Sequence, residues 1–268
     1  MIKIYQFLNV IKFLFTCFFS FNLFRKKSIL YFSNDKKYIF FSLFTLFKIL
    51  YYLFLNKIGL IFEINLRRKF YYSFKKDFEE FNLNIDWFKG SAYHWNQVFI
   101  KFNLYNKSLN ILEIGSYEGF SALFFLKKFK NSKISCVDPW IDYDENIKDN
   151  FKEIENRFDK NLSIYKDRLT KFKMFSNQFF DKKFNNETYD IIYVDGDHHF
   201  KTVYKDLINS FKLLKVDGFL IVDDFLTYNF YKENLNENPF GAVIVFLNKY
   251  MENIKFIKVT NQLIIQKK

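Results

Sequence analysis

Four residue types are scarce in this 268-residue chain, which has 2 cysteines, 2 prolines, 7 glycines and 3 histidines. Cys17 and Cys136 lie in different segments without C-x-x-C spacing, which argues against a disulfide framework or a zinc cluster. The glycines never form the G-x-G-x-x-G pattern of dinucleotide sites, which argues against an oxidoreductase that uses NAD. Half of the residues are hydrophobic, so the chain can bury a sizeable core.

Positive charge is concentrated near the N-terminus. Residues 1–90 hold 15 Lys and Arg against 6 Asp and Glu, whereas residues 91–268 hold 26 against 23. Such a basic excess could bind an anionic membrane surface or nucleic acid. The simpler alternative is a solvated face of a lysine-rich protein that binds neither. The near balance of the larger part predicts no basic groove, and we therefore expect no nucleic-acid partner.

Residues 1–65 contain two apolar runs, Ile4 to Phe24 and Tyr38 to Phe62, separated by a basic stretch. Each run is near the roughly 20 residues that span a bilayer, but both contain polar residues. If the second run spanned, the basic stretch would lie outside, against the positive-inside tendency. A single span, an in-plane amphipathic anchor and packing on the protein or on a second copy remain as alternatives. No small-residue cleavage site follows the first run, which argues against a signal peptide. We expect a cytoplasmic protein, with this segment as the candidate for membrane contact.

The rest of the chain falls into two further parts. Residues 66–108 have an amphipathic helical pattern, and we expect Trp87 and Trp95 to cover one edge of a sheet. From residue 109 to residue 268, short apolar strands alternate with helical stretches, the pattern of a parallel α/β sheet. The expected strands are 110–115, 133–138, 172–176, 189–195 and 218–223, with two terminal strands in 254–268 that must pair antiparallel. The expected helices are 119–130, 147–164, 177–183, 199–214 and 239–251, with a loop at 226–237.

A glycine turn follows the first expected strand, in the run Leu112-Glu-Ile-Gly-Ser-Tyr-Glu-Gly-Phe-Ser121. Gly115 permits a sharp turn, and Gly119 lets the next helix begin close to a ligand. Ligands of such sheets bind at the carboxyl ends of the strands. Asp138 ends the next strand, about 20 residues after the turn, where a carboxylate suits a ribose diol. An ordinary strand-to-helix turn, and a turn-starting aspartate, are the simpler readings of these two elements.

Acidic residues end the next two strands of the series. Asp195-Gly-Asp197-His198-His199 follows one strand, and Asp223-Asp224 follows the other. Because adjacent strand ends lie roughly 5 Å apart, Asp195, Asp223 and Asp224 should crowd together. A hard divalent cation such as Mg²⁺ would relieve their repulsion, since these metals prefer oxygen ligands. Taken singly, each aspartate could instead be a helix cap or turn residue.

With these elements together, residues 109–268 resemble the methyltransferase-24 type of class I S-adenosylmethionine (SAM) dependent methyltransferases. They are similar, more distantly, to catechol and macrolide-sugar O-methyltransferases. The resemblance implies a Rossmann-like α/β fold with five parallel strands and a terminal antiparallel hairpin, here with a helical N-terminal extension. It implies that SAM is the cofactor and that a divalent cation assists. The implied SAM-binding residues are Glu113, Gly115, Tyr117, Gly119, Ser121, Asp138 and Ser176.

The resemblance also implies roles for the acidic cluster. Asp195, Asp223 and Asp224 would hold the metal, and His198 would act as the base, a role that an imidazole pKa near 6.5 suits. Asp197 replaces a small polar residue of the family, and it could orient His198 or add charge at the metal. The expected reaction is O-methylation of a small-molecule or sugar hydroxyl, with the acceptor pocket formed by loop 226–237 and the N-terminal helices.

Other functions remain as alternatives to this reading. One is a non-catalytic scaffold on the same fold that docks on membranes, against which the retained acidic cluster argues. Another is a nucleic-acid methyltransferase, against which the absence of an Asn-Pro-Pro-Tyr type motif argues. The sequence leaves open whether the protein forms a homo-oligomer.

Overall fold

The computed structural model of the chain describes residues 36–84, 87–141, 150–182, 188–226 and 239–268. These residues contain one seven-stranded sheet in the order β3-β2-β1-β4-β5-β7-β6. The first five strands of that order are parallel, while β7 pairs antiparallel with both β5 and β6. The strands are β1 (Asn110–Ile114), β2 (Lys133–Asp138), β3 (Leu169–Lys173), β4 (Tyr189–Val194), β5 (Leu214–Val222), β6 (Ile254–Val259) and β7 (Leu263–Lys267). The expected class I methyltransferase sheet, with its terminal hairpin, is confirmed.

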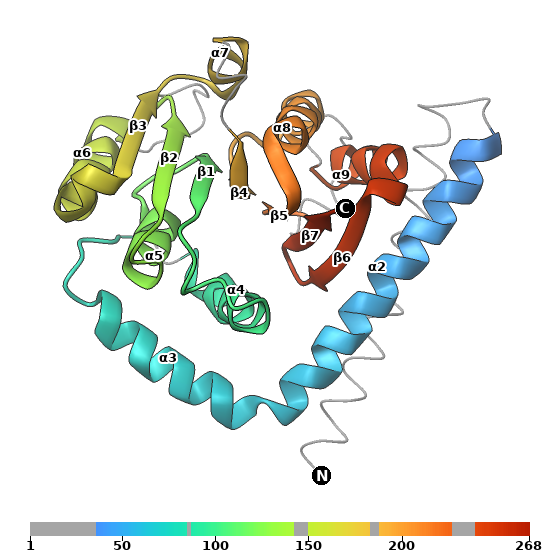
Figure 1. Cartoon of the computed structure of the whole chain (residues 1–268), viewed down its shortest axis with the longest axis horizontal. Helices are drawn as coiled ribbons and strands as arrows, with labels where there is room; N and C mark the ends of the chain where they lie inside the picture. The colour runs from blue at the N-terminus through green and yellow to red at the C-terminus, as the bar shows by residue number, and fades with distance from the viewer. Residues whose placement is uncertain (1–35, 85–86, 142–149, 183–187, 227–238) are drawn as a thin grey trace.

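Helices cover both faces of this sheet, as Figure 1 shows. The helices that the structure describes are α2 (Lys36–Phe62), α3 (Ile64–Phe78), α4 (Lys89–Lys101), α5 (Phe120–Lys128), α6 (Phe151–Leu162), α7 (Ser176–Asp181), α8 (Phe200–Leu213) and α9 (Pro239–Tyr250), with the short 3-10 helices η1 (Ser163–Arg168) and η4 (Met251–Asn253).

The core consists of two apolar clusters, one on each face of the sheet. Successive strand residues point to opposite faces, so Ile111 joins the cluster under α4, α5 and α6 while Leu112 joins the one under α8 and α9. The central strands are therefore apolar on both sides, as β4 is from Ile191 to Val194. This burial holds the strand ends, and the side chains that follow them, in fixed positions.

The expected elements agree with the observed ones except at two strands. β5, expected at 218–223, begins four residues earlier, at Leu214, and ends at Val222. We expected the third strand at 172–176, but β3 begins at Leu169 and ends at Lys173. The strand pairs only with β2 and its residues are exposed or half-buried, so it lacks the apolar run that marks the central strands. All of the expected loop 226–237 except Leu226 lies outside the described residues.

The N-terminal helices run along the outside of the domain. α2 packs its residues Ile49 and Leu53 against the β6 and α9 side of the molecule, and the Thr45 hydroxyl donates to Asn248 Oδ1 at 2.7 Å. The chain then bends, and α3 lies beside α4. Within the described ranges no single helix is long and apolar enough to cross a membrane, although the bent pair Phe47–Phe62 and Ile64–Phe78, at 82°, meets that test together. The first apolar run and the basic stretch, up to residue 35, lie outside the described residues.

The two tryptophans of the lead-in segment differ in their surroundings. Trp95 is fully buried on α4 and meets the ring of Tyr193 edge-on at 4.8 Å, so it covers the face of the central strand β4 and not an edge of the sheet as expected. The same expectation for Trp87 is wrong, because that side chain is 70% exposed. It lies instead 5.1 Å from the ring of Tyr117, a residue of the glycine turn. Trp87 therefore covers the turn and not the sheet.

Candidate active site

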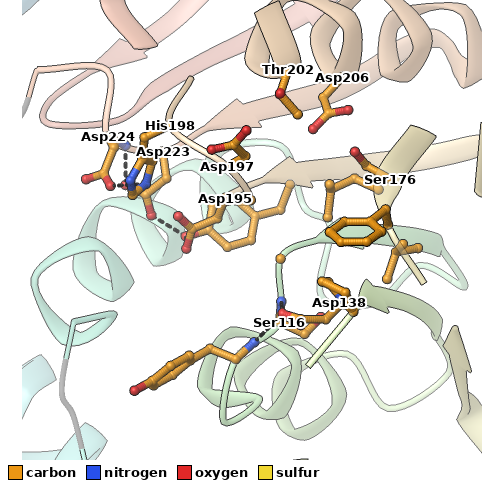
Figure 2. Close-up of a pocket in the computed structure, with 18 of the residues that line it drawn as sticks. Ser116, Asp138, Ser176, Asp195, Asp197, His198, Thr202, Asp206, Asp223 and Asp224 are labelled. Carbon is orange, nitrogen blue, oxygen red and sulfur yellow. Dashed lines mark hydrogen bonds and ion pairs between the residues drawn. The ribbon is translucent and has the colours of Figure 1, made fainter. Parts of the chain in front are cut away.

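A cavity of about 1300 Å³ opens at the carboxyl ends of β1, β2, β4 and β5. Figure 2 shows Ser116 and Asp138 on one side of it, Ser176 and Asp206 on another, and the His198 cluster on a third. This is the edge of a parallel sheet where ligands bind. Of the residues predicted from the sequence, those that line the cavity are Gly115, Tyr117, Ser121, Asp138, Ser176, Asp195, His198, Asp223 and Asp224.

The glycine turn depends on two left-handed residues. Gly115 has φ +85°, and a Cβ there would lie 2.0 Å from the carbonyl oxygen of Asp195. Gly119 has φ +82°, and its Cβ would lie 2.8 Å from Leu162 and 2.9 Å from Phe158. Only glycine adopts this backbone without strain and leaves room for such neighbours. Gly119 therefore permits close packing against α6, and it does not line the cavity as expected.

Glu113 lies beneath the turn and does not line the cavity. Its fully buried carboxylate accepts from the Ser116 hydroxyl at 2.8 Å, from the Ser121 hydroxyl and from Cys136 Sγ at 3.3 Å. Burial raises the pKa of Glu113 to about 7, although the two serine hydroxyls oppose that rise. The expectation that Glu113 lines a cofactor pocket is corrected, because the side chain points into the core, where it fixes the turn. The hydroxyl of Ser121 is directed to this carboxylate.

Asp138 clamps the same turn from the neighbouring strand. Its Oδ2 accepts from the backbone N–H of Ser116 at 2.9 Å and of Tyr117 at 3.0 Å, and its Oδ1 accepts from the N–H of Trp140 at 2.7 Å. Burial raises the pKa of Asp138 while these three donors lower it. Each carboxylate oxygen can accept more than one hydrogen bond. The side chain can therefore orient the turn and still accept from a ligand in the cavity.

A buried ion pair behind the turn escaped the sequence analysis. The Glu118 carboxylate, 2% exposed, contacts Arg157 Nε of α6 at 2.7 Å and accepts from the backbone N–H of Asn84 at 2.8 Å. The side chain of Asn161 in turn bonds both the N–H and the carbonyl of Asn82. These contacts tie the segment between α3 and α4 to the glycine turn. No motif marks them, because the partners are more than 30 residues apart in sequence.

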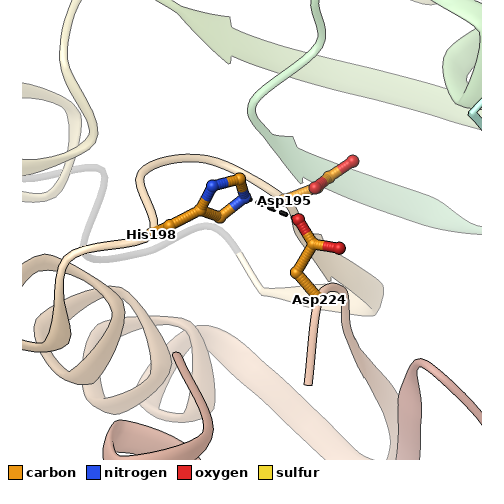
Figure 3. Close-up of side chains that lie close together, drawn as sticks. All are labelled: Asp195, His198 and Asp224. Atoms are coloured by element: carbon orange, nitrogen blue, oxygen red, sulfur yellow. Dashed lines mark ion pairs between the residues drawn. The ribbon is translucent and has the colours of Figure 1, made fainter. Parts of the chain in front are cut away.

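Three ionisable side chains meet where β4 and β5 end. One ligand atom each from Asp195, His198 and Asp224 lies within 4.8 Å of the others, as Figure 3 shows. His198 Nε2 lies 2.7 Å from Asp224 Oδ2, and this bond raises the pKa of the imidazole. Asp195 is half-buried, and the loss of solvent around its carboxyl, followed by the charge of Asp223, raises the pKa of that carboxyl well above the ordinary range. Crowding of the acidic residues is thus observed, as the strand ends predicted.

Asp223 belongs to a second polar network that extends into the core. Its Oδ2 accepts from the Tyr193 hydroxyl and, at 2.6 Å, from Gln262 Nε2. The Gln262 side chain also accepts from the indole N–H of Trp95 at 2.6 Å, and the Tyr193 hydroxyl lies 2.7 Å from Asp195 Oδ2. Asp223 lines the cavity but is held by Tyr193 and Gln262, whereas Asp195 and Asp224 lie together with His198. Gln262 lies in the turn between β6 and β7, and no motif in the sequence of that turn indicates this role.

The two remaining ionisable residues of the β4 loop pair with each other. Asp197 Oδ1 lies 2.5 Å from His199 Nδ1, and it also accepts from the backbone N–H of His199 at 3.2 Å. Although burial would raise the pKa of Asp197, hydrogen bonds from Thr202 and His199 lower it. The sequence left two roles open for Asp197, which were to orient His198 or to add charge at the metal. The observed hydrogen bond joins Asp197 to His199 and not to His198, so the first role is not the observed one.

One stretch of the chain matches a known protein-family model. Residues 112–225 match the family Methyltransf_24, described as a methyltransferase domain. The chain contains a methyltransferase domain. The methyltransferase domain spans the glycine turn, Asp138 and the acidic residues after β4 and β5, and the expectation of a SAM-dependent methyltransferase is confirmed at the level of the family. No curated protein matches the chain.

Three solved structures illustrate what the chain is similar to. A proposed caffeoyl-CoA O-methyltransferase from Staphylococcus aureus is 18% identical with a TM-score of 0.51, over 79% of this chain and 99% of that one. An O-methyltransferase from Bacillus cereus, solved with SAH (S-adenosylhomocysteine), is 13% identical with a TM-score of 0.48, over 65% of this chain and 81% of that one. MycE of the mycinamycin pathway is 16% identical with a TM-score of 0.49, over 69% of this chain and 51% of that one. At 18% identity, the likeness to the Staphylococcus aureus structure shows the fold alone.

Proposed function

We propose that this protein transfers the methyl group of SAM to a hydroxyl oxygen of a small molecule or sugar. The observation that carries the proposal is the single cavity that joins the glycine turn and Asp138 to the His198 cluster. A cavity of about 1300 Å³ can hold a nucleoside cofactor together with an acceptor, since drug-sized ligands occupy about 300–1,000 Å³.

The residues around the glycine turn fit SAM. At Gly115 the backbone lies so close to Asp195 that a residue with a Cβ would not fit. The turn leaves the strand end open to a ligand. Asp138 is placed to accept from the ribose hydroxyls, and Tyr117 and Ser176 line the same space. When bound, SAM supplies a methyl carbon that an oxygen attacks in line, so that the new C–O bond forms as the C–S bond breaks.

The acidic residues after β4 and β5 fit a hard divalent cation. Asp195 and Asp224 offer carboxylate oxygens within 4.8 Å of each other, a donor set that Mg²⁺ prefers. Asp223, the third predicted ligand, is held by Tyr193 and Gln262, and it adds its charge from behind. A cation held here would lower the pKa of an acceptor hydroxyl.

His198 is the proposed base of the reaction. His198 lines the cavity, and its Nε2 lies 2.7 Å from Asp224 Oδ2. A neutral imidazole that donates through Nε2 to this carboxylate keeps its other ring nitrogen, Nδ1, to take the proton that the acceptor hydroxyl loses. The main contribution of the other cavity residues is to place donor and acceptor in contact.

Replacement of Asp195 separates cofactor binding from catalysis. In Asp195→Asn the acidic pair loses one charged ligand, whereas the glycine turn and Asp138 are untouched. We expect SAH to bind as in the wild type while methyl transfer to hydroxyl acceptors falls at least 100-fold and no longer responds to Mg²⁺. Unchanged turnover in this variant would refute the role given to the acidic cluster.

We also propose, independently of the methyl transfer, that the N-terminal segment contacts a membrane. Large apolar side chains at helical spacing are exposed on α2, among them Phe44 at 49%, Phe47 at 61% and Tyr51 at 58%. Such a stripe beside basic residues is typical of helices that lie on anionic bilayers. Sedimentation with phosphatidylserine vesicles tests it, and loss of binding in a variant with serine at these three positions is the expected result. Sedimentation of wild type and variant to the same extent would rule out this surface.

A further inference from the structure

A buried glutamine of the terminal hairpin, beyond the stretch that matches the family model, lies against the acidic residues. Because Val222 pairs with Leu263 in the antiparallel register of β5 and β7, the next position along each strand sets Gln262 beside Asp223. The Gln262 backbone is also fixed, since its N–H donates to the Thr260 hydroxyl at 3.0 Å and its carbonyl accepts from the Thr260 N–H at 2.7 Å. The hairpin therefore holds this side chain, which is 1% exposed, in place at the acidic site.

The indole of Trp95 determines which end of the Gln262 amide meets Asp223. An indole N–H can only donate, so the amide oxygen must face it, and the two atoms lie 2.6 Å apart. The amide nitrogen then faces Asp223 Oδ2 at 2.6 Å, and it lies 3.5 Å from the Tyr193 hydroxyl oxygen. Two segments that flank the family stretch, α4 and the terminal hairpin, thus act together on one carboxylate.

These contacts hold the Asp223 carboxylate in one orientation. Each carboxylate oxygen has two lone pairs, and those of Oδ2 receive the Gln262 amide and the Tyr193 hydroxyl. The other oxygen, Oδ1, accepts from the backbone N–H of Asp224 at 2.7 Å. Since Asp223 also lines the cavity, its negative charge is fixed beside the place proposed for the cation.

A neutral amide suits a carboxylate that has to keep its charge. Lysine or arginine at position 262 would form an ion pair with Asp223 and would repel a cation bound nearby. An apolar residue there would leave the carboxylate short of a donor and free to rotate. Glutamine satisfies the hydrogen bonding of Asp223 without cancelling its charge.

We propose that Gln262, oriented by Trp95, is a positioning residue that fixes Asp223 beside the cation site and thereby sets the affinity of the protein for a divalent cation. The inference rests on the proposed function, because it requires that the acidic residues hold such a cation. Groups that hydrogen-bond the ligands of a metal site from behind typically change its affinity by about 10–100-fold when they are removed.

Titration of the full-length protein with Mn²⁺, followed by the electron paramagnetic resonance signal of the free ion, tests the proposal without any methyl acceptor. In Gln262→Met, which keeps the length of the side chain and loses the amide, Mn²⁺ should bind at least about tenfold more weakly than in the wild type. The affinity for SAH, measured by calorimetry without a divalent cation, should equal that of the wild type, because the glycine turn and Asp138 are untouched. A role in folding alone would not change one affinity without the other.

Tyr105→Phe is the matched control for the loss of a hydrogen bond inside the protein. The half-buried Tyr105 hydroxyl donates to Asn96 Oδ1 at 2.8 Å, and the Tyr105 ring lies 5.0 Å from that of Phe129, just after the end of α5. Tyr105 precedes the start of β1, whereas the cavity lies at the carboxyl end of that strand. We expect both affinities of this variant to equal those of the wild type.

The outcomes separate the inference from the function on which it rests. Binding of neither ligand by the folded wild type would refute both, and binding of SAH without Mn²⁺ would refute the cation and the inference but not the SAM site. Equal Mn²⁺ affinity in the wild type and in folded Gln262→Met would overturn the inference and leave the cation site standing. A parallel loss of Mn²⁺ and SAH affinity would also overturn it, since Gln262 would then support the fold in general.

A second variant covers the case in which Gln262→Met does not fold. Trp95→Phe keeps an aromatic ring in the core and removes the indole N–H that orients the Gln262 amide. Weaker Mn²⁺ binding with unchanged SAH binding is the expected result, and unchanged Mn²⁺ binding would contradict the proposal.

Discussion

The replacement of Gly115 by alanine should destabilise the domain more than a single added methyl group usually does. The new Cβ would lie 2.0 Å from the carbonyl oxygen of Asp195, 2.5 Å from its carbonyl carbon and 2.7 Å from the Cα of Gly196. All three are backbone atoms, and β1 and β4 are adjacent paired strands, so neither side can move cheaply. A left-handed conformation costs alanine about 1–2 kcal/mol, and overpacking costs about 1–3 kcal/mol more. We therefore expect a loss of about 2–5 kcal/mol in the free energy of unfolding.

Gly90→Ala is the matched control for this prediction. Gly90 lies in α4, and a Cβ there would have nothing within 4 Å. Alanine in a helix is favoured over glycine by about 0.5–1 kcal/mol, so this variant should be as stable as the wild type or slightly more stable. Urea denaturation followed by circular dichroism measures both. Equal stability of the Gly115→Ala variant and the wild type would refute the close approach of the turn to β4.

Three further predictions concern buried polar groups. Because burial raises the pKa of Glu113 to about 7, the folded state binds its proton more tightly than the unfolded state, and the associated stability is lost as pH rises from about 4.5 through 7. The wild type should lose about 2–3 kcal/mol more than Glu113→Gln between pH 5 and pH 8, measured by urea denaturation, and parallel pH curves would contradict this. Gln262→Leu deprives the Asp223 carboxylate of a hydrogen-bond donor, so the free energy of unfolding of this variant should be about 2 kcal/mol lower than that of the wild type. An unchanged midpoint of urea denaturation would remove Gln262 from the network. Glu118→Gln leaves the largely buried Arg157 with only the exposed Glu153, 3.8 Å away, as a carboxylate partner, and should cost about 3 kcal/mol. Glu80→Gln, at an exposed pair, should change stability by less than about 0.5 kcal/mol, and similar losses in both variants would contradict the account.

The fold could be predicted from the sequence because its signals are local. β1, β2 and β4 are strands of five or six residues with apolar residues in the middle, and each ends at or just before a residue whose type marks a turn or a site. The crowding of Asp195 and Asp224 followed from strand order alone, since parallel neighbours end at the same edge. The edge strand β3 was placed three residues late because, with one partner strand, it carries no such run.

The roles that the sequence did not reveal depend on contacts between distant segments. Glu113 looks like a ligand residue in a motif, but Ser116, Ser121 and Cys136 enclose its carboxylate in the core. Gln262 comes within 2.6 Å of Asp223 only because the terminal hairpin folds back beside β5. No periodicity or motif carries that information.

The cofactor site is tested most directly by calorimetric titration of the full-length protein with SAH, in the wild type, in Asp138→Ala and in Asp190→Ala. Asp190 lies at the opposite end of the sheet, where it bonds Lys215 and the N–H of Asn110, so its loss should not affect the cavity. The account predicts binding by the wild type and by Asp190→Ala, and binding at least tenfold weaker by Asp138→Ala. The absence of binding by the folded wild type, or equal affinity in all three proteins, would contradict it.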